Sequence, residues 1–171
     1  TLYFNDMKNI TLFLLASVIF TACTTPFESF GEFSRKQLQN SEHNSWFMDN
    51  YDAHPLNDTL VSQIDSLFSE IEVTIYMGTW CEDSQREVAG FFRIIDALDA
   101  NDQISRLVGL NEDKISHDGS AEEAGITNVP TFIFSKKGEE INRIVEFPII
   151  SLEQDILDIL QDKGYKHAYD F

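Results

Sequence analysis

The segment 71–110 constrains the fold most, because two strand patterns in it flank one long helical pattern. Residues 71–77, "IEVTIYM", are rich in β-branched side chains and alternate, which is typical of a strand. A helix is predicted to begin near Cys81, since apolar residues then recur at helical spacing. They are Val88, Phe91, Phe92, Ile95 and Leu98. Residues 104–110, "ISRLVGL", form a second strand pattern. This order predicts two parallel strands joined by a right-handed crossover.

The remaining chain adds a hairpin and further helices to this unit. The apolar run 130–134 and the segment 140–147 flank a turn that contains Gly138, which predicts an antiparallel hairpin. A short helix is expected around 121–124. Amphipathic helices are predicted before and after the sheet, capped by Asn57 or Asp58 and by Ser151 respectively. We therefore expect an α/β fold, with a central mixed sheet and helices on both faces.

The N-terminal region has the layout of an export signal. From Met7 the chain reads "MKNITLFLLASVIFTAC", with a lysine, a short apolar run and small residues before Cys23. The apolar run is shorter than the ~20 residues that span a bilayer. Residues 1–22 are interpreted as six upstream residues followed by a signal peptide. The residues before Cys23 resemble the lipobox of bacterial lipoproteins, which implies lipidation of Cys23 and a membrane-anchored location in the cell envelope.

The region after the signal divides into a tether and one domain. Residues 23–45 are polar and weakly periodic, so they are interpreted as a tether with a short helix near 35–39. The domain is predicted to occupy 46–171, with an aromatic extension from Trp46 and a core at 56–163.

Charge and histidine placement exclude several classes of site. The formal net charge is −17, from 12 basic and 29 acidic residues, so nucleic-acid binding is not expected. The four histidines fall in unrelated segments without ligand spacing, and they are interpreted as exposed loop residues. They are His43, His54, His117 and His167. We expect neither a metal nor a cofactor.

Two motifs resemble those of the thioredoxin family over roughly residues 56–163. "TWCEDS" (79–84) lies where the family has W-C-x-x-C, at a helix start after a central strand. "VPTFIF" (129–134) resembles the stretch around the family's cis-proline, here Pro130. The resemblance implies a thioredoxin-like fold, a reactive Cys81 and a groove formed by Trp80 and Pro130. Val129 and Thr131 would contribute to binding an incoming chain.

Three departures from the family motif change the expected chemistry. Ser84 replaces the resolving cysteine, so the chain cannot complete a dithiol cycle, although its hydroxyl can donate a hydrogen bond to the thiolate. Ile75 stands where the family carries a buried aspartate. A helix N-terminus favours the thiolate, whereas three nearby carboxylates would oppose it. They belong to Glu82, Asp83 and Glu146.

Two functions are consistent with these residues. The first is thiol-disulfide exchange with a protein or small-molecule partner through Cys81, with an external thiol resolving the mixed disulfide; isomerisation and reduction belong to the same chemistry. The alternative is a non-catalytic binding module that uses the Trp80/Pro130 groove. Lipidation of Cys23 would leave Cys81 as the only free thiol of an exported protein.

Overall fold

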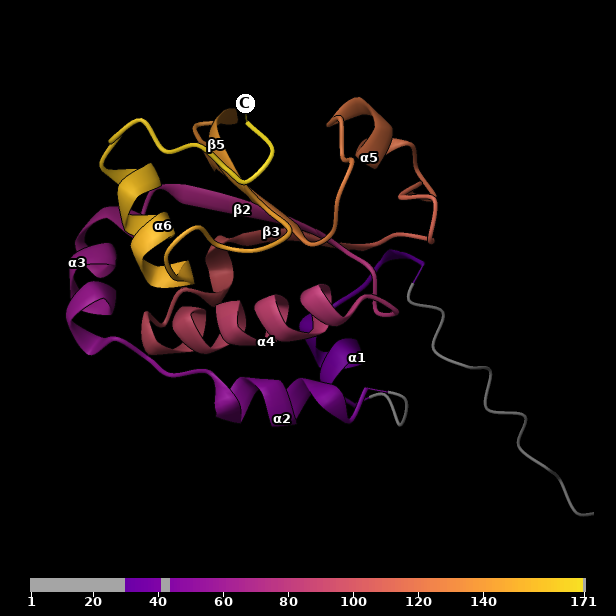
Figure 1. Cartoon of the computed structure of the whole chain (residues 1–171), viewed down its shortest axis with the longest axis horizontal. Helices are drawn as coiled ribbons and strands as arrows, with labels where there is room; N and C mark the ends of the chain where they lie inside the picture. Colours follow the sequence, from indigo (N-terminus) through magenta and orange to yellow (C-terminus); the bar gives the residue numbers. More distant parts are fainter. Residues whose placement is uncertain (1–29, 41–43, 171) are drawn as a thin grey trace, which may run out of the picture.

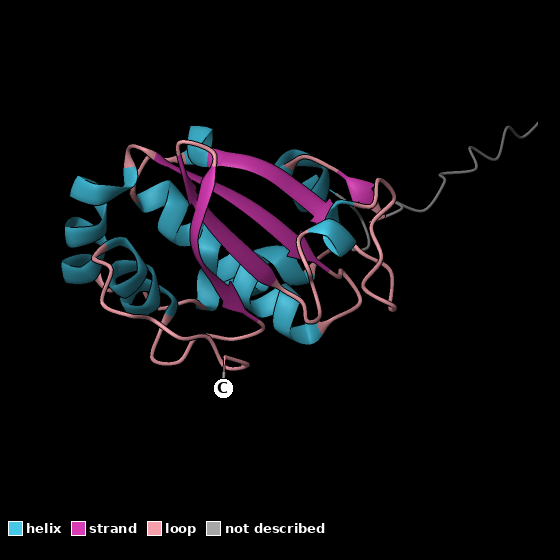
Figure 2. Cartoon of the chain, turned by 90° about the horizontal axis from the view of Figure 1, so that it is seen from above, coloured by secondary structure: helices cyan, strands magenta, loops and turns pink. Residues whose placement is uncertain are grey.

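The computed structural model describes residues 30–40 and 44–170. The predicted signal peptide, Cys23 and His43 lie outside these residues. A five-stranded mixed sheet runs through the centre (Figures 1 and 2), in the order β1-β3-β2-β4-β5. Its strands are β1 (Gly31–Glu32), β2 (Ile71–Met77), β3 (Ile104–Gly109), β4 (Thr131–Lys136) and β5 (Glu139–Val145). As predicted, β2 and β3 are parallel, and β4 and β5 form an antiparallel hairpin.

The helices begin close to the predicted positions because local capping signals fix them. Asn57 accepts a hydrogen bond from Leu60 N at the start of α3, and Ser151 accepts one from Gln154 N at the start of α6. Both are N-cap interactions that satisfy a free backbone N–H of the first turn. The helical elements are α1 (Arg35–Asn40), α2 (Trp46–Ala53), α3 (Asp58–Phe68), α4 (Glu82–Ala97), the 3₁₀ turn η1 (Asn101–Gln103), α5 (Ser120–Glu123) and α6 (Leu152–Leu160).

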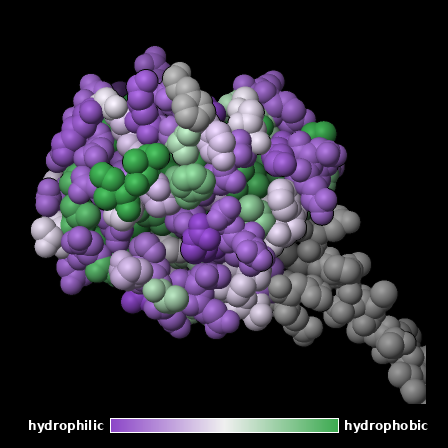
Figure 3. All heavy atoms as spheres, in the orientation of Figure 1, coloured by the Kyte–Doolittle hydropathy of each residue, from purple (hydrophilic) through white to green (hydrophobic). Residues whose placement is uncertain are grey.

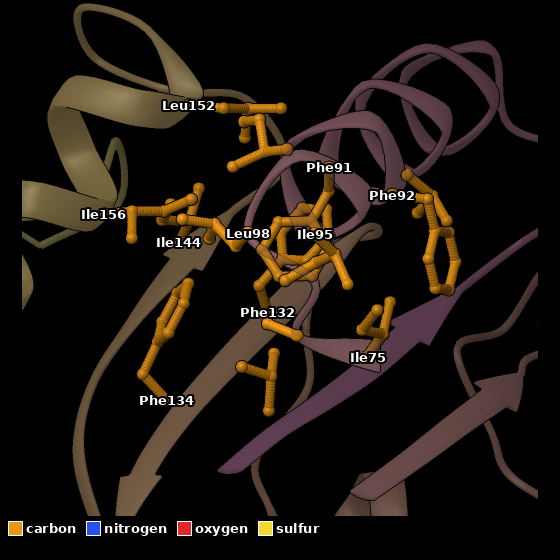
Figure 4. Packing of buried hydrophobic residues seen from close by; sticks show 14 of the residues in the cluster. Ile75, Phe91, Phe92, Ile95, Leu98, Phe132, Phe134, Ile144, Leu152 and Ile156 are labelled. Carbon is orange, nitrogen blue, oxygen red and sulfur yellow. The ribbon is translucent and has the colours of Figure 1, made fainter. Parts of the chain in front are cut away.

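The main core lies between one face of the sheet and the helices packed on it. Alternate strand residues point into it, including Ile75, Phe132 and Phe134, all fully buried. Figure 4 shows Phe91 and Ile95 of α4 meeting these side chains, and the rings of Phe91 and Phe132 lie 4.7 Å apart. The predicted apolar stripe of α4 is therefore its core-facing side.

The opposite face of the sheet carries little helix. A smaller cluster, which includes Tyr76, Val108 and Ile133, packs there against Ala121 of the short helix α5. Figure 1 shows α5 on the side of the sheet away from α4. Polar residues such as Thr74 and Ser105 occupy the rest of this face, with their hydroxyls 3.0 Å apart. Among the described residues, α5 is thus the helix that covers the second face, while the other helices pack on the first.

The predicted tether contains the expected short helix, α1, but the part that the structure describes is folded onto the domain. Gly31 and Glu32 pair with β3 as an antiparallel edge strand, and Leu38 of α1 is fully buried in the main core. Phe33 is also buried. Residues 30–40 are therefore part of the folded domain, because their apolar side chains cover the core beside α4. In the same part of the chain, α2 packs on α4 through Phe47 and Phe92, as expected for the aromatic extension.

Within residues 30–40 and 44–170, no helix is both long and apolar enough to cross a membrane.

Candidate thiol site

Cys81 lies at the junction of β2 and α4, as the N-cap residue of the helix. Its backbone N–H donates to Gly78 O at 3.0 Å, which closes a tight turn after the strand. Its side chain is partly exposed and forms no disulfide among the described residues. The thiol Sγ donates to the carbonyl oxygen of Val129 at 3.4 Å. The strand end and the turn thus hold the sulfur at the surface, at the start of a 16-residue helix.

A second loop brings the proline motif against the sulfur. The Val129–Pro130 peptide bond is cis, as the resemblance implied. Thr131 Oγ1 donates to Asn128 O at 2.8 Å and so closes this loop. Val129 is 4% exposed and packs in the cluster that Cys81 borders. The structure therefore brings together Cys81, Val129 and Pro130, which are far apart in the sequence.

Ser84 lies beneath the turn and has a different partner from the one expected. It is fully buried, and its Oγ accepts a hydrogen bond from Gly78 N at 3.2 Å. Among the described residues, no hydrogen bond joins Ser84 to the sulfur. The hydroxyl therefore supports the 78–81 turn. Sequence reasoning missed Gly78, whose only signal is its place between the strand and Trp80.

The Trp80 ring lies over this turn and leaves part of its surface exposed. A Cβ at Gly78 would come within 2.4 Å of Trp80 Cε2, so only glycine permits the ring to lie there. Trp80 Nε1 donates to Leu110 O at 2.9 Å, and Lys114 Nζ lies 5.7 Å from the ring centroid. The ring is thus fixed beside the sulfur's turn while 42% exposed.

The three carboxylates predicted near the sulfur have different surroundings. Glu82 is exposed, and Asp83 pairs with Arg86 at 2.6 Å on the helix surface. The Glu146 carboxylate accepts from Asn128 Nδ2 at 3.1 Å and from the hydroxyl of Tyr169. The charges of Asp83 and Glu146 are therefore partly compensated by local donors.

Exposed apolar side chains occur near the same loops. Besides Trp80, they are Phe147, Ile149 and Ile150 of the β5–α6 loop. Figure 3 shows small hydrophobic groups within a mostly hydrophilic face. Glu146, the first residue of this loop, donates its backbone N–H to Pro130 O at 2.7 Å, which places the start of the loop beside the proline.

His54 does not occupy the exposed position that was predicted. Its side chain is 17% exposed, and its Nε2 lies 3.4 Å from Glu153 Oε1 of α6. Burial favours a higher pKa for Glu153, but His54 and backbone N–H donors outweigh burial and lower that pKa. Burial raises the pKa of Glu87 on α4, although Arg86 and His54 oppose the rise. His54 is therefore a packing residue between α4 and α6.

No cluster of three or more His, Cys, Asp or Glu residues with the spacing of a metal site occurs in the part of the chain that the structure describes.

Comparisons with known proteins show structures of similar fold. No family model matches the sequence, and no curated protein matches it. A solved structure of a protein of unknown function from Pseudomonas aeruginosa is similar, with a TM-score of 0.57 and 13% identity, over 78% of this chain and 93% of that one. An HIV epitope scaffold is similar with a TM-score of 0.56 and 14% identity, over 80% of this chain and 94% of its own. At these identities the similarity concerns the mixed α/β fold alone.

Proposed function

We propose that this chain is a thioredoxin-like protein that takes part in thiol-disulfide exchange through Cys81. One observation carries the proposal: a partly exposed thiol at the N-terminus of α4 lies against the carbonyl of the residue before a cis-proline. The helix N-terminus favours the thiolate, which is the nucleophile in disulfide exchange.

The proposed reaction has two steps. The Cys81 thiolate attacks one sulfur of a disulfide R–S–S–R, forms Cys81–S–S–R and releases R–S⁻. An external thiolate then attacks the mixed disulfide and returns Cys81 as a thiolate. Because Ser84 has no thiol, the described site offers no internal group for the second step. The mixed disulfide should therefore persist until a partner thiol arrives.

The proposed location is the bacterial cell envelope, with attachment to a membrane through lipid on Cys23. The lipobox-like sequence before Cys23 supports this location. Lipidated Cys23 could not pair with Cys81, which would then be available to thiols and disulfides of other molecules. Stable anchoring by lipid usually takes two membrane-binding signals, such as two acyl chains.

The test uses a Cys23→Ser chain, so that Cys81 is the only cysteine. The protein is mixed with oxidised glutathione at neutral pH, and intact mass is recorded before and after addition of a reducing thiol. We expect one glutathione adduct per chain, released by the thiol. The matched control is the same chain with Cys81→Ser, which should form no adduct. Absence of an adduct on the native Cys81 chain would refute the proposal.

A binding module is the second candidate, and the fixed position of Trp80 favours it. The Trp80 indole donates to Leu110 O and lies over Gly78, so we expect the exposed ring to keep its position without the thiol. For this function, a partner should bind equally well to Cys81→Ser and lose affinity with Trp80→Ala. A partner that is lost with Cys81→Ser would favour the exchange reaction instead.

A further inference from the structure

Glu146 has an unusual backbone conformation beside the thiol site. Its φ is 68°, in the left-handed region that favours glycine and costs a non-glycine residue of order 1 kcal/mol or more. Such a conformation persists when surrounding contacts determine it, and it occurs often at functional sites. The contacts of Glu146 are therefore informative.

Glu146 links three segments of the chain. Its backbone N–H donates to Pro130 O at 2.7 Å. Its carboxylate accepts from Asn128 Nδ2 at 3.1 Å, so backbone and side chain both hold the 128–130 loop. The same carboxylate oxygen accepts from the Tyr169 hydroxyl of the C-terminal segment. Asn128 and Pro130 flank Val129, whose carbonyl accepts from the Cys81 thiol.

The C-terminal segment that carries Tyr169 is itself anchored to the domain. Asn142 Nδ2 of β5 donates to Tyr165 O at 3.1 Å. The Tyr165 hydroxyl donates to the buried Asp155 at 2.9 Å, and Asp155 also accepts from the backbone N–H groups of Ile149 and Ile150. The segment therefore contacts both β5, at Asn142, and Glu146 at the start of the β5–α6 loop; Figure 1 shows the C-terminus near β5.

We propose that Glu146 is a positioning residue for the Cys81 site, and that Tyr169 of the C-terminal segment supports it. This inference rests on the proposed function of Cys81. By fixing Asn128 and Pro130, Glu146 holds the Val129 carbonyl against the thiol.

The expected effect on Cys81 follows from the direction of its hydrogen bond. The Val129 carbonyl accepts from the Cys81 S–H at 3.4 Å and so covers one side of the sulfur. Releasing the 128–130 loop removes that contact and uncovers the sulfur. The thiol should then react faster.

The experiment measures the rate of Cys81 alkylation by iodoacetamide at pH 7, together with the thermal unfolding midpoint, in the Cys23→Ser chain. Glu146→Ala and Glu146→Gly should each raise the rate about three- to tenfold, the factor that corresponds to one hydrogen bond. Tyr169→Phe should raise it about twofold, because it removes one of two donors to the carboxylate. Glu146→Gln should keep the alkylation rate of the unsubstituted chain, since its amide oxygen can accept from Asn128 and Tyr169.

Two comparisons separate positioning from a structural role. Glu146→Gly also removes the strain of a positive φ, so its rate should rise while its unfolding midpoint stays near that of the unsubstituted chain. Glu139→Ala, at the exposed start of the same strand, should change neither quantity. If Glu146→Ala does not fold, the Glu146→Gln and Tyr169→Phe rates decide.

Equal alkylation rates in the unsubstituted chain, Glu146→Gly and Tyr169→Phe would overturn this inference. That result would leave the proposed exchange reaction intact, provided that Cys81 still forms the glutathione adduct. Conversely, a chain that forms no adduct in any variant would refute the exchange reaction, while the alkylation rates still decide the role of Glu146.

Discussion

Asp96 of α4 joins the N-terminal helices to the rest of the domain, and its replacement gives a quantitative test of the fold. Its carboxylate accepts from both terminal nitrogens of Arg35 on α1, each at 2.5 Å. It also accepts from the Tyr51 hydroxyl of α2 at 2.7 Å and from Asn101 Nδ2 at 3.0 Å. The Arg35 guanidinium lies 4.7 Å from the Phe92 ring centroid. One carboxylate thus connects four segments.

The expected cost of Asp96→Asn follows from these contacts. The amide keeps one acceptor oxygen but loses the charge and the paired geometry with Arg35. Hydrogen bonds to charged groups contribute roughly 1.5–3 kcal/mol each, and the exposed fractions of 21% and 31% place this pair at the low end. We expect a loss of about 2 kcal/mol in unfolding free energy, which is about 4–8 °C in melting temperature for a chain of this size.

The pH dependence of the unfolding free energy is a second, independent test of the Asp96 contacts. The hydrogen bond from Arg35 lowers the pKa of Asp96 to about 2, against the opposing effect of burial and with help from Asn101 and Tyr51. Because the folded pKa lies below the unfolded one, the stabilisation is full above about pH 4 and disappears as pH falls toward 2. The stability difference between the unsubstituted chain and Asp96→Asn should therefore narrow over that interval.

Urea unfolding followed by circular dichroism at pH 7 and at several lower pH values measures both effects. Asp102→Asn is the matched control, because Asp102 is an exposed carboxylate in the neighbouring η1 turn. It should change stability by less than about 0.5 kcal/mol. An Asp96→Asn chain as stable at pH 7 as this control would refute the account of how α1 and α2 are attached.

Three further substitutions test other parts of the structure. Gly90→Ala should lower the unfolding free energy by about 1–3 kcal/mol, since a Cβ there would lie 2.6 Å from His54 Nδ1. Alanine in an open helix raises stability instead, so a more stable protein would show that the His54 contact is absent. Leu38→Ala should cost about 2–5 kcal/mol in chemical unfolding because Leu38 is fully buried, whereas a cost below about 1 kcal/mol would support the tether interpretation of this segment. Ser84→Cys should shorten the lifetime of a Cys81 mixed disulfide, because it adds a resolving thiol. The lifetime is measured by mass spectrometry after quenching, and an unchanged value would show that a thiol at position 84 does not reach Cys81.

Sequence reasoning succeeded where local patterns determine the structure. The alternating residues 71–77 form β2 with the predicted bounds, and the Asn57 and Ser151 side chains cap their helices. The position of Cys81 at the helix start followed from the sequence, because the strand alternation of 71–77 ends before it and the helical spacing of apolar residues begins after it. The approach of Val129 to Cys81 followed from the motif resemblance, since no local pattern joins residues 48 positions apart.

The failures have a common physical cause, which is dependence on distant partners. β1 has two residues and no periodicity, and it is held to β3 by backbone pairing and by an ion pair between Glu32 and Arg106. Leu38 is buried in the main core, and His54 is partly buried because Gly90 leaves room for its ring. The role of Glu146 likewise depends on Asn128 and Tyr169, which no spacing rule connects.

The reactivity of Cys81 in the folded chain tests the central claim most directly. In the Cys23→Ser chain, the rate of exchange of Cys81 with a small disulfide is compared between the native and the urea-unfolded protein at neutral pH. Cys81 is partly exposed at a helix N-terminus and is covered on one side by the Val129 carbonyl. It should therefore react in the native protein within about tenfold of its rate in the unfolded chain. A native rate lower by orders of magnitude would identify Cys81 as a buried structural thiol and contradict the account.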